Sequence, residues 1–280
     1  MPILGIIDSR EDFTYGQSVA MAGCAFALRK INPNYSGNCI ELRRSSDNAT
    51  SNFGFDGSGD LDTGSIDSWV GSDSAYVKTW YDQSGNGRNV TQSAAGSQPR
   101  LYNAGVLEKM NSVPAMYFDD NDILDNSSPG WIAGVYYAFA AVTMPDETVA
   151  SSWYIGTRSV DTSNYRLQIG YNGSNSYKIA QWNNDATFTP TWTTGTVYAH
   201  AGKKNNPSGS TLWQNGSLIS TQTQPSNVQL ITATTFTIGA GGGDTNYFKG
   251  WLGEVVVWAY SISSSQLLVA HSAQRSRFGV

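Results

Sequence analysis

The sequence predicts an all-β protein that folds as a two-sheet sandwich or jelly roll. Charged residues make up only 14% of the 280 residues, whereas an average soluble domain has roughly 25%, much of it on surface helices. Aromatic residues make up 12%, which is too much apolar surface for a disordered chain. Beyond about residue 115, short alternating segments are separated by turn sequences such as Asn172-Gly173 and Asn215-Gly216. Many short strands joined by such turns favour a sandwich.

Three segments are predicted to be helical. Residues 16–30 are small and apolar nearly all round and end in two basic residues, so we expect a buried helix there. Residues 61–71 predict a short helix with Asp62 or Thr63 as its N-cap. Residues 264–275 predict a C-terminal helix, because a Ser and a Gln three residues apart form a capping box before an apolar stripe.

Alternation of apolar and polar residues predicts the strands. No change in composition marks a linker, so we expect residues 16–280 to form one domain, preceded by residues 1–15 as an arm or a first strand. The expected strands are residues 39–44, 76–81, 115–118, 136–142, 152–156, 165–171, 176–182, 197–203, 210–214, 236–240 and 250–260.

Charge and hydropathy narrow the range of partners. The net charge of −5 and the pI near 4.9 argue against a nucleic-acid partner. No stretch approaches the ~20 apolar residues of a membrane-spanning helix, so no membrane partner is expected. The start lacks the basic segment of a secretory signal, which favours synthesis in the cytoplasm. Cys24 and Cys39 are therefore expected to be free buried thiols, with a single bridge as the alternative.

One acidic loop is a candidate metal site. Asp56, Asp60 and Asp62 place oxygen ligands at alternate positions, as a calcium loop does. Leu61 stands where an EF-hand loop has Gly, so the alternative is that Asp62 caps the short helix and the other acids face solvent. We expect no cofactor, with calcium as the alternative. His200 and His271 are far apart in sequence, which argues against zinc; His200 is expected to be a hydrogen-bonded sheet residue and His271 a surface or cap residue.

The most informative segment begins at Trp80. An aromatic strand end runs into a turn with two glycines, where Asp82 and Asn86 can bind backbone amides. These residue types predict a structural role. The residues of the motif are Trp80, Tyr81, Asp82, Gln83, Ser84, Gly85, Asn86 and Gly87.

This motif also carries a family resemblance. The order YSG, RRSSDN, GDLDT, WYDQSGNGRNVTQ and QPRLYNAG resembles the core of the α-L-arabinofuranosidase B catalytic domain. It resembles still more closely the concanavalin A/laminin G-like domains of bacteriophage virion proteins, and the opening MPILGII is similar to the start of such proteins. The closing GWLGEVVVWAYSISSSQ looks like the last strand and helix of a laminin G-type sandwich. The resemblance implies a concanavalin A-like sandwich with an N-terminal-region helix and a C-terminal helix.

The arabinofuranosidase pattern implies two catalytic carboxyl groups. It has a nucleophilic Glu just before Asn-Asn, but here Trp182 precedes Asn183 and Asn184. Asp244 matches the acid that follows a glycine-rich strand end. A retaining glycosidase needs two carboxyl groups about 5–5.5 Å apart, and Trp cannot attack an anomeric carbon. The nearby substitutes in sequence fall at no matching position: Asp185 and Glu254.

From the missing nucleophile we expect a non-enzymatic structural protein of a phage particle, either a head decoration or a tail fibre or baseplate component. The alternatives are an arabinofuranosidase-type glycoside hydrolase and a stand-alone carbohydrate-binding module. Expected partners are other virion proteins that contact residues 1–15, further copies of the chain, and a host polysaccharide. Aromatic and amide residues are the candidate glycan contacts, although aromatics at alternate strand positions usually belong to a core. They are Trp153, Trp182, Trp192, Trp213, Asn183, Asn184 and Asp244.

Overall fold

The computed structural model describes residues 13–127, 131–132, 136–148, 151–158, 166–173, 175–181, 185–206, 209–223, 235–241 and 246–280. Within these ranges, 19 strands form one hydrogen-bonded antiparallel network and two more form a separate hairpin. The helices are α1 (Tyr15–Ala20), α2 (Thr63–Val70) and α3 (Ser264–Phe278), with a 3-10 turn η1 (Ala95–Ser97). The all-β class predicted from the sequence is confirmed.

The strands of the first half are short. They are β1 (Cys24–Ala27), β2 (Ile40–Arg44), β3 (Thr50–Phe53), β4 (Ala75–Trp80), β5 (Val90–Thr91), β6 (Arg100–Asn103), β7 (Val106–Leu107), β8 (Lys109–Met110), β9 (Val113–Pro114), β10 (Met116–Phe118) and β11 (Leu124–Asn126). Longer strands follow: β12 (Ala138–Pro145), β13 (Ser152–Arg158), β14 (Gln168–Tyr171), β15 (Tyr177–Ala180), β16 (Ala186–Phe188), β17 (Tyr198–Asn206), β18 (Gly209–Gln214), β19 (Ser217–Thr223), β20 (Thr235–Ile238) and β21 (Gly250–Trp258).

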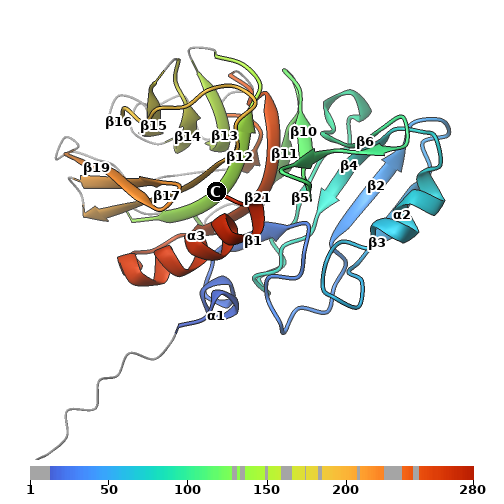
Figure 1. Cartoon of the computed structure of the whole chain (residues 1–280), viewed down its shortest axis with the longest axis horizontal. Coiled ribbons are helices and arrows are strands. Elements are labelled where there is room, and N and C mark those ends of the chain that lie inside the picture. Colours follow the sequence, from blue (N-terminus) through green and yellow to red (C-terminus); the bar gives the residue numbers. More distant parts are fainter. Residues whose placement is uncertain are drawn as a thin grey trace, which may run out of the picture.

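The middle layer of the molecule is a curved sheet built around β12 and β21 (Figure 1). Ala140 of β12 lies opposite Val256 of β21 on one side and Ala201 of β17 on the other. Alternate side chains of this layer face different cores. Phe139 and Val255 belong to the large core beneath the second sheet, whereas Ala140 and Val256 belong to a core that also contains apolar residues of α3. The middle sheet is therefore buried on both faces.

The second layer runs in the order β16–β15–β14–β13–β20–β11–β5–β4–β2–β3. It joins the middle layer through β6 and β10, because β6 pairs with both β4 and β10, and β10 pairs with β21. In Figure 1, α3 lies beneath the middle sheet, and α2 lies beside β2 and β3 at the far end of the molecule. No helix among the described residues is long and apolar enough to cross a bilayer.

The helix predicted over residues 16–30 is wrong beyond Ala20. Thr14 caps the short α1, and the chain then turns into β1, whose four residues are all buried. β1 pairs antiparallel with β21, with Ala25 opposite Val256. The small apolar side chains that suggested a buried helix instead fit a strand that is covered on both faces, a pattern that periodicity does not separate from a helix.

The other helices follow the prediction closely. Asp62 is the N-cap of α2, and its side chain accepts a hydrogen bond from the Ser65 N–H at 3.1 Å. Ser263 and Gln266 form the capping box of α3. Cys24 and Cys39 are free and buried, as expected.

The two histidines differ in outcome. His200 lies in β17, is buried, and its Nε2 lies 3.0 Å from Gln214 Oε1, as predicted. The prediction for His271 is wrong, because this side chain is buried and its Nε2 accepts a hydrogen bond from the Gly216 N–H. Burial lowers the pKa of His271 to about 4, so the neutral ring acts as an acceptor inside the fold.

Candidate functional site

The motif at residues 80–87 supports the free edge of β1. Asp82 accepts four hydrogen bonds, from the N–H groups of Ala25, Ser84 and Arg88 and from the Ser84 hydroxyl. Gln83 donates to the carbonyls of Ala27 and Arg29 and accepts from the Ile31 N–H. These side chains complete the backbone bonds that a neighbouring strand would otherwise make.

Two further residues of the motif bind the same chain segment. Trp80 Nε1 donates to the Ala27 carbonyl, and Asn86 Nδ2 donates to the carbonyls of Ala22 and Gly23. Gly85 and Gly87 both have positive φ, at 95° and 68°, which glycine adopts without strain. Tyr81 donates to Asn52 Oδ1 at the surface. The described contacts of the motif are structural.

The three carboxyl groups of the acidic loop each bind a different partner. Asp56 Oδ1 accepts from the N–H groups of Ser58 and Asp60, and Asp60 pairs with Arg277 at 2.6 Å. Asp62 is the helix cap already described. No group of three or more His, Cys, Asp or Glu residues with metal-binding geometry occurs within the described ranges. Calcium at this loop stays a sequence-based prediction.

Most of the predicted glycan contacts lie outside the described residues: Trp182, Asn183, Asn184 and Asp244. Trp213 of β18 is only 8% exposed and packs in the core that contains residues of α3. Trp153 and Trp192 are also buried. All three indoles are thus buried, which leaves little of their surface open to a glycan, and the predicted glycan contacts stay a prediction.

The two segments that resemble the arabinofuranosidase catalytic segments converge on β14. Ala180, at the end of the first segment, lies opposite Gln168 in the pairing of β15 with β14. In the second segment, a Cβ added at Gly241 would lie 2.7 Å from Gln168 Nε2. The ends of β15 and β20, which lead toward Trp182 and Asp244, are thus both adjacent to one residue of one strand.

A buried polar cluster lies at the end of β15. Lys204 of β17 is fully buried, its Nζ donates to Gln181 Oε1 at 2.6 Å, and its backbone N–H donates to the Tyr137 carbonyl. Within the described residues, no carboxylate pairs with this ammonium group. Burial lowers the pKa of Lys204 to about 8, as expected for a cation removed from water.

Three atoms of this cluster have unused hydrogen-bonding capacity. The Tyr137 hydroxyl, Gln181 Nε2 and Asp185 Oδ1 are buried and lack a hydrogen-bond partner among the described residues. Burial, and then the nearby charge of Asp185, raises the pKa of Tyr137 well above its usual range. Asp185 Oδ2 is bound by Lys178 at 3.1 Å, so its other oxygen is the open one. Buried polar groups without partners mark a place where a polar ligand or water is expected.

Sequence analysis pointed to Asp185 but missed Lys204, Gln181 and Tyr137. The strand pattern carried a signal for Lys204. Tyr198, His200 and Lys204 are separated by even numbers of residues in β17, so they share a face, and the first two are buried there. A lysine that continues a buried face is unusual and marks a specialised environment.

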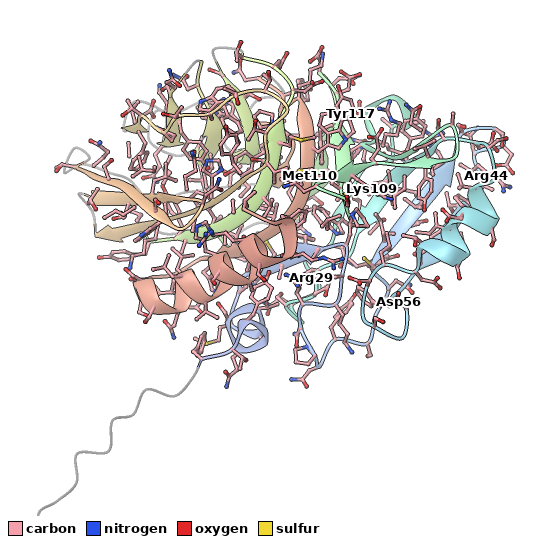
Figure 2. The ribbon with its side chains drawn as sticks, in the orientation of Figure 1. Arg29, Arg44, Asp56, Lys109, Met110 and Tyr117 are labelled. Carbon is pink, nitrogen blue, oxygen red and sulfur yellow. The ribbon has the colours of Figure 1, made fainter. Side chains whose placement is uncertain are left out.

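Glu254, the other carboxyl group considered from the sequence, is committed elsewhere. It is 1% exposed in β21, where Arg29 Nε lies 2.6 Å from its Oε1 and the Tyr15 hydroxyl donates to its Oε2. Figure 2 labels Arg29 close to α3, on the side of the middle sheet away from β14. Both oxygens of Glu254 therefore bind structural partners.

The two sheet layers form a β-sandwich, with the polar cluster at one end of its strands. The family model of the concanavalin A-like lectin/glucanases superfamily matches residues 127–268. The chain belongs to this superfamily, and the predicted concanavalin A-like sandwich is confirmed. A second family model, that of the α-L-arabinofuranosidase B catalytic domain, matches residues 15–116.

Solved structures extend the likeness to nearly the whole chain. An arabinofuranosidase complexed with arabinofuranosyl-α-1,2-xylobiose superposes with a TM-score of 0.70 at 15% identity, covering 92% of this chain and 62% of that chain. A GH54 α-L-arabinofuranosidase soaked with a cyclic sulfate inhibitor gives 0.71 at 16% identity with the same coverage. The chain thus spans about three fifths of the length of these structures. No curated protein sequence matches.

These findings correct the functional expectation drawn from the sequence. The catalytic-domain model and the GH54 structures favour the glycoside hydrolase alternative over a non-enzymatic structural protein of a phage particle. The expectation rested on one position, Trp182, in a segment that only loosely resembles the arabinofuranosidase pattern. The superfamily and the arabinofuranosidase likeness stand, whereas the phage context is not shown by these comparisons.

Proposed function

We propose that the protein is a glycoside hydrolase of the α-L-arabinofuranosidase type. The observation that carries the proposal is the convergence on Gln168 of the two segments that resemble the family's catalytic segments. A glycosidase needs two carboxyl groups on opposite sides of one sugar ring. The strand ends that precede Asp185 and Asp244 meet at one residue, although the two carboxyl groups are about sixty residues apart in sequence, and this supports the proposal.

The polar cluster supplies groups that suit a sugar. The Tyr137 hydroxyl, Gln181 Nε2 and the Lys204 ammonium group can bind the hydroxyls of a small sugar ring in a site that excludes water. Asp244 is proposed as the acid that protonates the leaving oxygen. Asp185, with one open oxygen beside the cluster, is proposed as the second carboxyl group. Its separation from Asp244 would decide whether it attacks carbon or activates water.

The direct test is release of 4-nitrophenol from 4-nitrophenyl α-L-arabinofuranoside. We expect turnover by the unaltered protein, and a fall in kcat on the order of 100-fold or more for Asp244→Asn and for Asp185→Asn, since each loses a proton-transferring or attacking group. Asp120→Asn, which removes an exposed carboxyl group away from the cluster, should keep full activity. Absence of turnover above the buffer rate by the unaltered protein would refute the proposal.

The location and partners form a separate proposal, supported by the similarity of the opening MPILGII to virion proteins. The hydrolase would be carried on a phage particle, attached to other virion proteins through residues 1–15 and assembled with further copies of itself. Mass spectrometry of purified particles tests this: the chain should be present in a fixed ratio to the major capsid protein. Deletion of residues 1–12 should abolish its attachment, and a chain absent from particles would refute the location.

A further inference from the structure

A groove of about 490 Å³ lies on the part of the molecule formed by β2, β4, β6 and β10. Arg43, Tyr76, Arg100, Tyr117 and Asp122 are among the residues that line it. Figure 2 labels Tyr117 on this side, away from the strands β14 to β16 that carry the proposed hydrolase site. The volume falls within the range of small-molecule sites, which is about 300–1,000 Å³.

Asp122 is one of two buried polar residues that line the groove, the other being Gln98. Its side chain is nine-tenths buried, with 6% of the residue exposed. Oδ2 accepts a hydrogen bond from the Asp119 N–H at 2.8 Å, whereas Oδ1 has no partner within the described residues. Oδ1 is not among the buried atoms that lack a partner, so it is open to the groove. An open carboxyl oxygen can accept a hydrogen bond from a hydroxyl group of a ligand bound there.

The two arginines are held in place by the protein itself. Arg43 donates to Gln98 Oε1 at 2.7 Å and lies over the Tyr76 ring, with 4.9 Å from Cζ to the ring centre. Arg100 binds the Glu108 carboxylate at 2.8 Å and lies over Tyr117, also at 4.9 Å. Both guanidinium groups are thus already hydrogen-bonded and stacked on aromatic rings. They line the groove in fixed positions and are not free to bind an anion with two parallel hydrogen bonds.

The mixture of charges selects the class of ligand. Asp119 and Asp122 oppose an anion in the groove, and the guanidinium groups of Arg43 and Arg100 oppose a cation. A neutral molecule with several hydroxyl groups meets no such penalty, because each hydroxyl can donate to a carboxylate and accept from a side-chain N–H. We propose that this groove is a second saccharide site, which binds one or two neutral sugar residues without cleaving them.

The test measures binding of xylobiose and cellobiose by saturation-transfer NMR and calorimetry, with glucuronic acid as the charged comparator. Neutral disaccharides should bind, and Asp122→Ala should raise Kd at least tenfold. Tyr76→Ala, in the lining of the groove, should also weaken binding and serves as a second variant if Asp122→Ala does not fold. The matched control is Asp120→Ala, which removes a neighbouring exposed carboxyl group outside the groove and should leave Kd unchanged.

This experiment is separable from the hydrolase assay, because it needs no turnover. Asp122→Ala should leave release of 4-nitrophenol at the level of the unaltered protein. Three results would overturn the second site: neither disaccharide binds, glucuronic acid binds more tightly than both, or Asp122→Ala and Tyr76→Ala leave Kd unchanged. Failure of the hydrolase assay alone leaves the binding result standing.

Discussion

Asp122 is a buried carboxyl group that accepts a hydrogen bond through only one of its oxygens. Its burial makes the stability of the protein depend on pH. Burial, together with the charge of Asp119, raises its pKa to about 6. The ionised form is therefore disfavoured in the folded protein relative to the unfolded chain. The resulting loss of stability is absent below about pH 4, where the carboxyl group is protonated in both states, and grows as the pH rises through about 6.

Asp122→Asn should consequently stabilise the protein at pH 8 but not at pH 3. A pKa raised by about two pH units corresponds to about 3 kcal/mol in the free energy of unfolding, so this is the upper bound for the gain at pH 8. Urea unfolding at pH 3, 5 and 8 measures it, with Asp120→Asn as the exposed control. An equal difference at pH 3 and pH 8 would contradict the assignment of the raised pKa to this residue.

Single residues were predictable where the signal is local. Asp62 was expected as a cap because N-cap chemistry acts over three residues. His271 was misplaced because its burial depends on the contact between α3 and the β18–β19 turn, where Gly216 donates to it. No local pattern reports that contact. The unpartnered atoms of Tyr137 and Gln181 likewise arise only when β12 and β15 meet in space.

At the scale of elements, β1 depends on both of its neighbours. One edge pairs with β21, and the side chains of the 80–87 motif bind the other. This arrangement explains why the segment is a strand although its composition suited a helix: tertiary hydrogen bonds override a weak intrinsic preference. The motif was predictable as structural from its residue types, but its partner strand was not.

Asp82→Ala should therefore destabilise the fold strongly. The change leaves the N–H groups of Ala25, Ser84 and Arg88 without their acceptor, at a cost of about 1–3 kcal/mol for each buried group. We expect a loss of about 3 kcal/mol or more in the free energy of unfolding, measured by urea titration. Asp82→Asn keeps one acceptor oxygen and should lose less. A loss below about 1 kcal/mol for Asp82→Ala would contradict the structural role.

At the scale of the whole molecule, Glu254 connects elements from both ends of the chain. It lies in β21 and binds Arg29, which follows β1, and Tyr15 of α1, while Arg29 Nη2 also donates to the Ala273 carbonyl of α3. The buried carboxylate therefore joins the N-terminal region to the C-terminal strand and helix. Removal of one member of such a group leaves an uncompensated charge.

Glu254→Ala is expected to lower the free energy of unfolding by about 3–5 kcal/mol. A double-mutant cycle with Arg29→Met, measured by calorimetry and urea unfolding, separates the energy of the ion pair from that of side-chain packing. Glu254→Gln, which keeps the size of the side chain and one of its two acceptor oxygens, should remain active as a hydrolase. Loss of turnover by a stable Glu254→Gln protein would contradict the structural role and make Glu254 a catalytic candidate.

The fold class was predictable because alternation and turn sequences repeat along the chain, so single errors such as residues 21–30 do not change it. The pairing of β1 with β21 was not predictable, because no local feature of the sequence specifies the register of two strands more than 200 residues apart. Function was harder still. The absence of Glu at Trp182 favoured a non-enzymatic role, whereas the likeness of the remaining chain to arabinofuranosidase domains favours the opposite.

The pairing of β1 with β21 also constrains how the chain is made. Residues 24–27 leave the ribosome long before residues 250–258, which supply their partner strand. Until β21 has been made, the nascent chain contains an apolar segment without its partner strand. Such a segment is prone to associate with other chains. Formation of this sheet therefore requires that β21 has been synthesised, and the many contacts between distant residues make folding slow. Nascent chains that stop short of β21 should be the ones that chaperones retain.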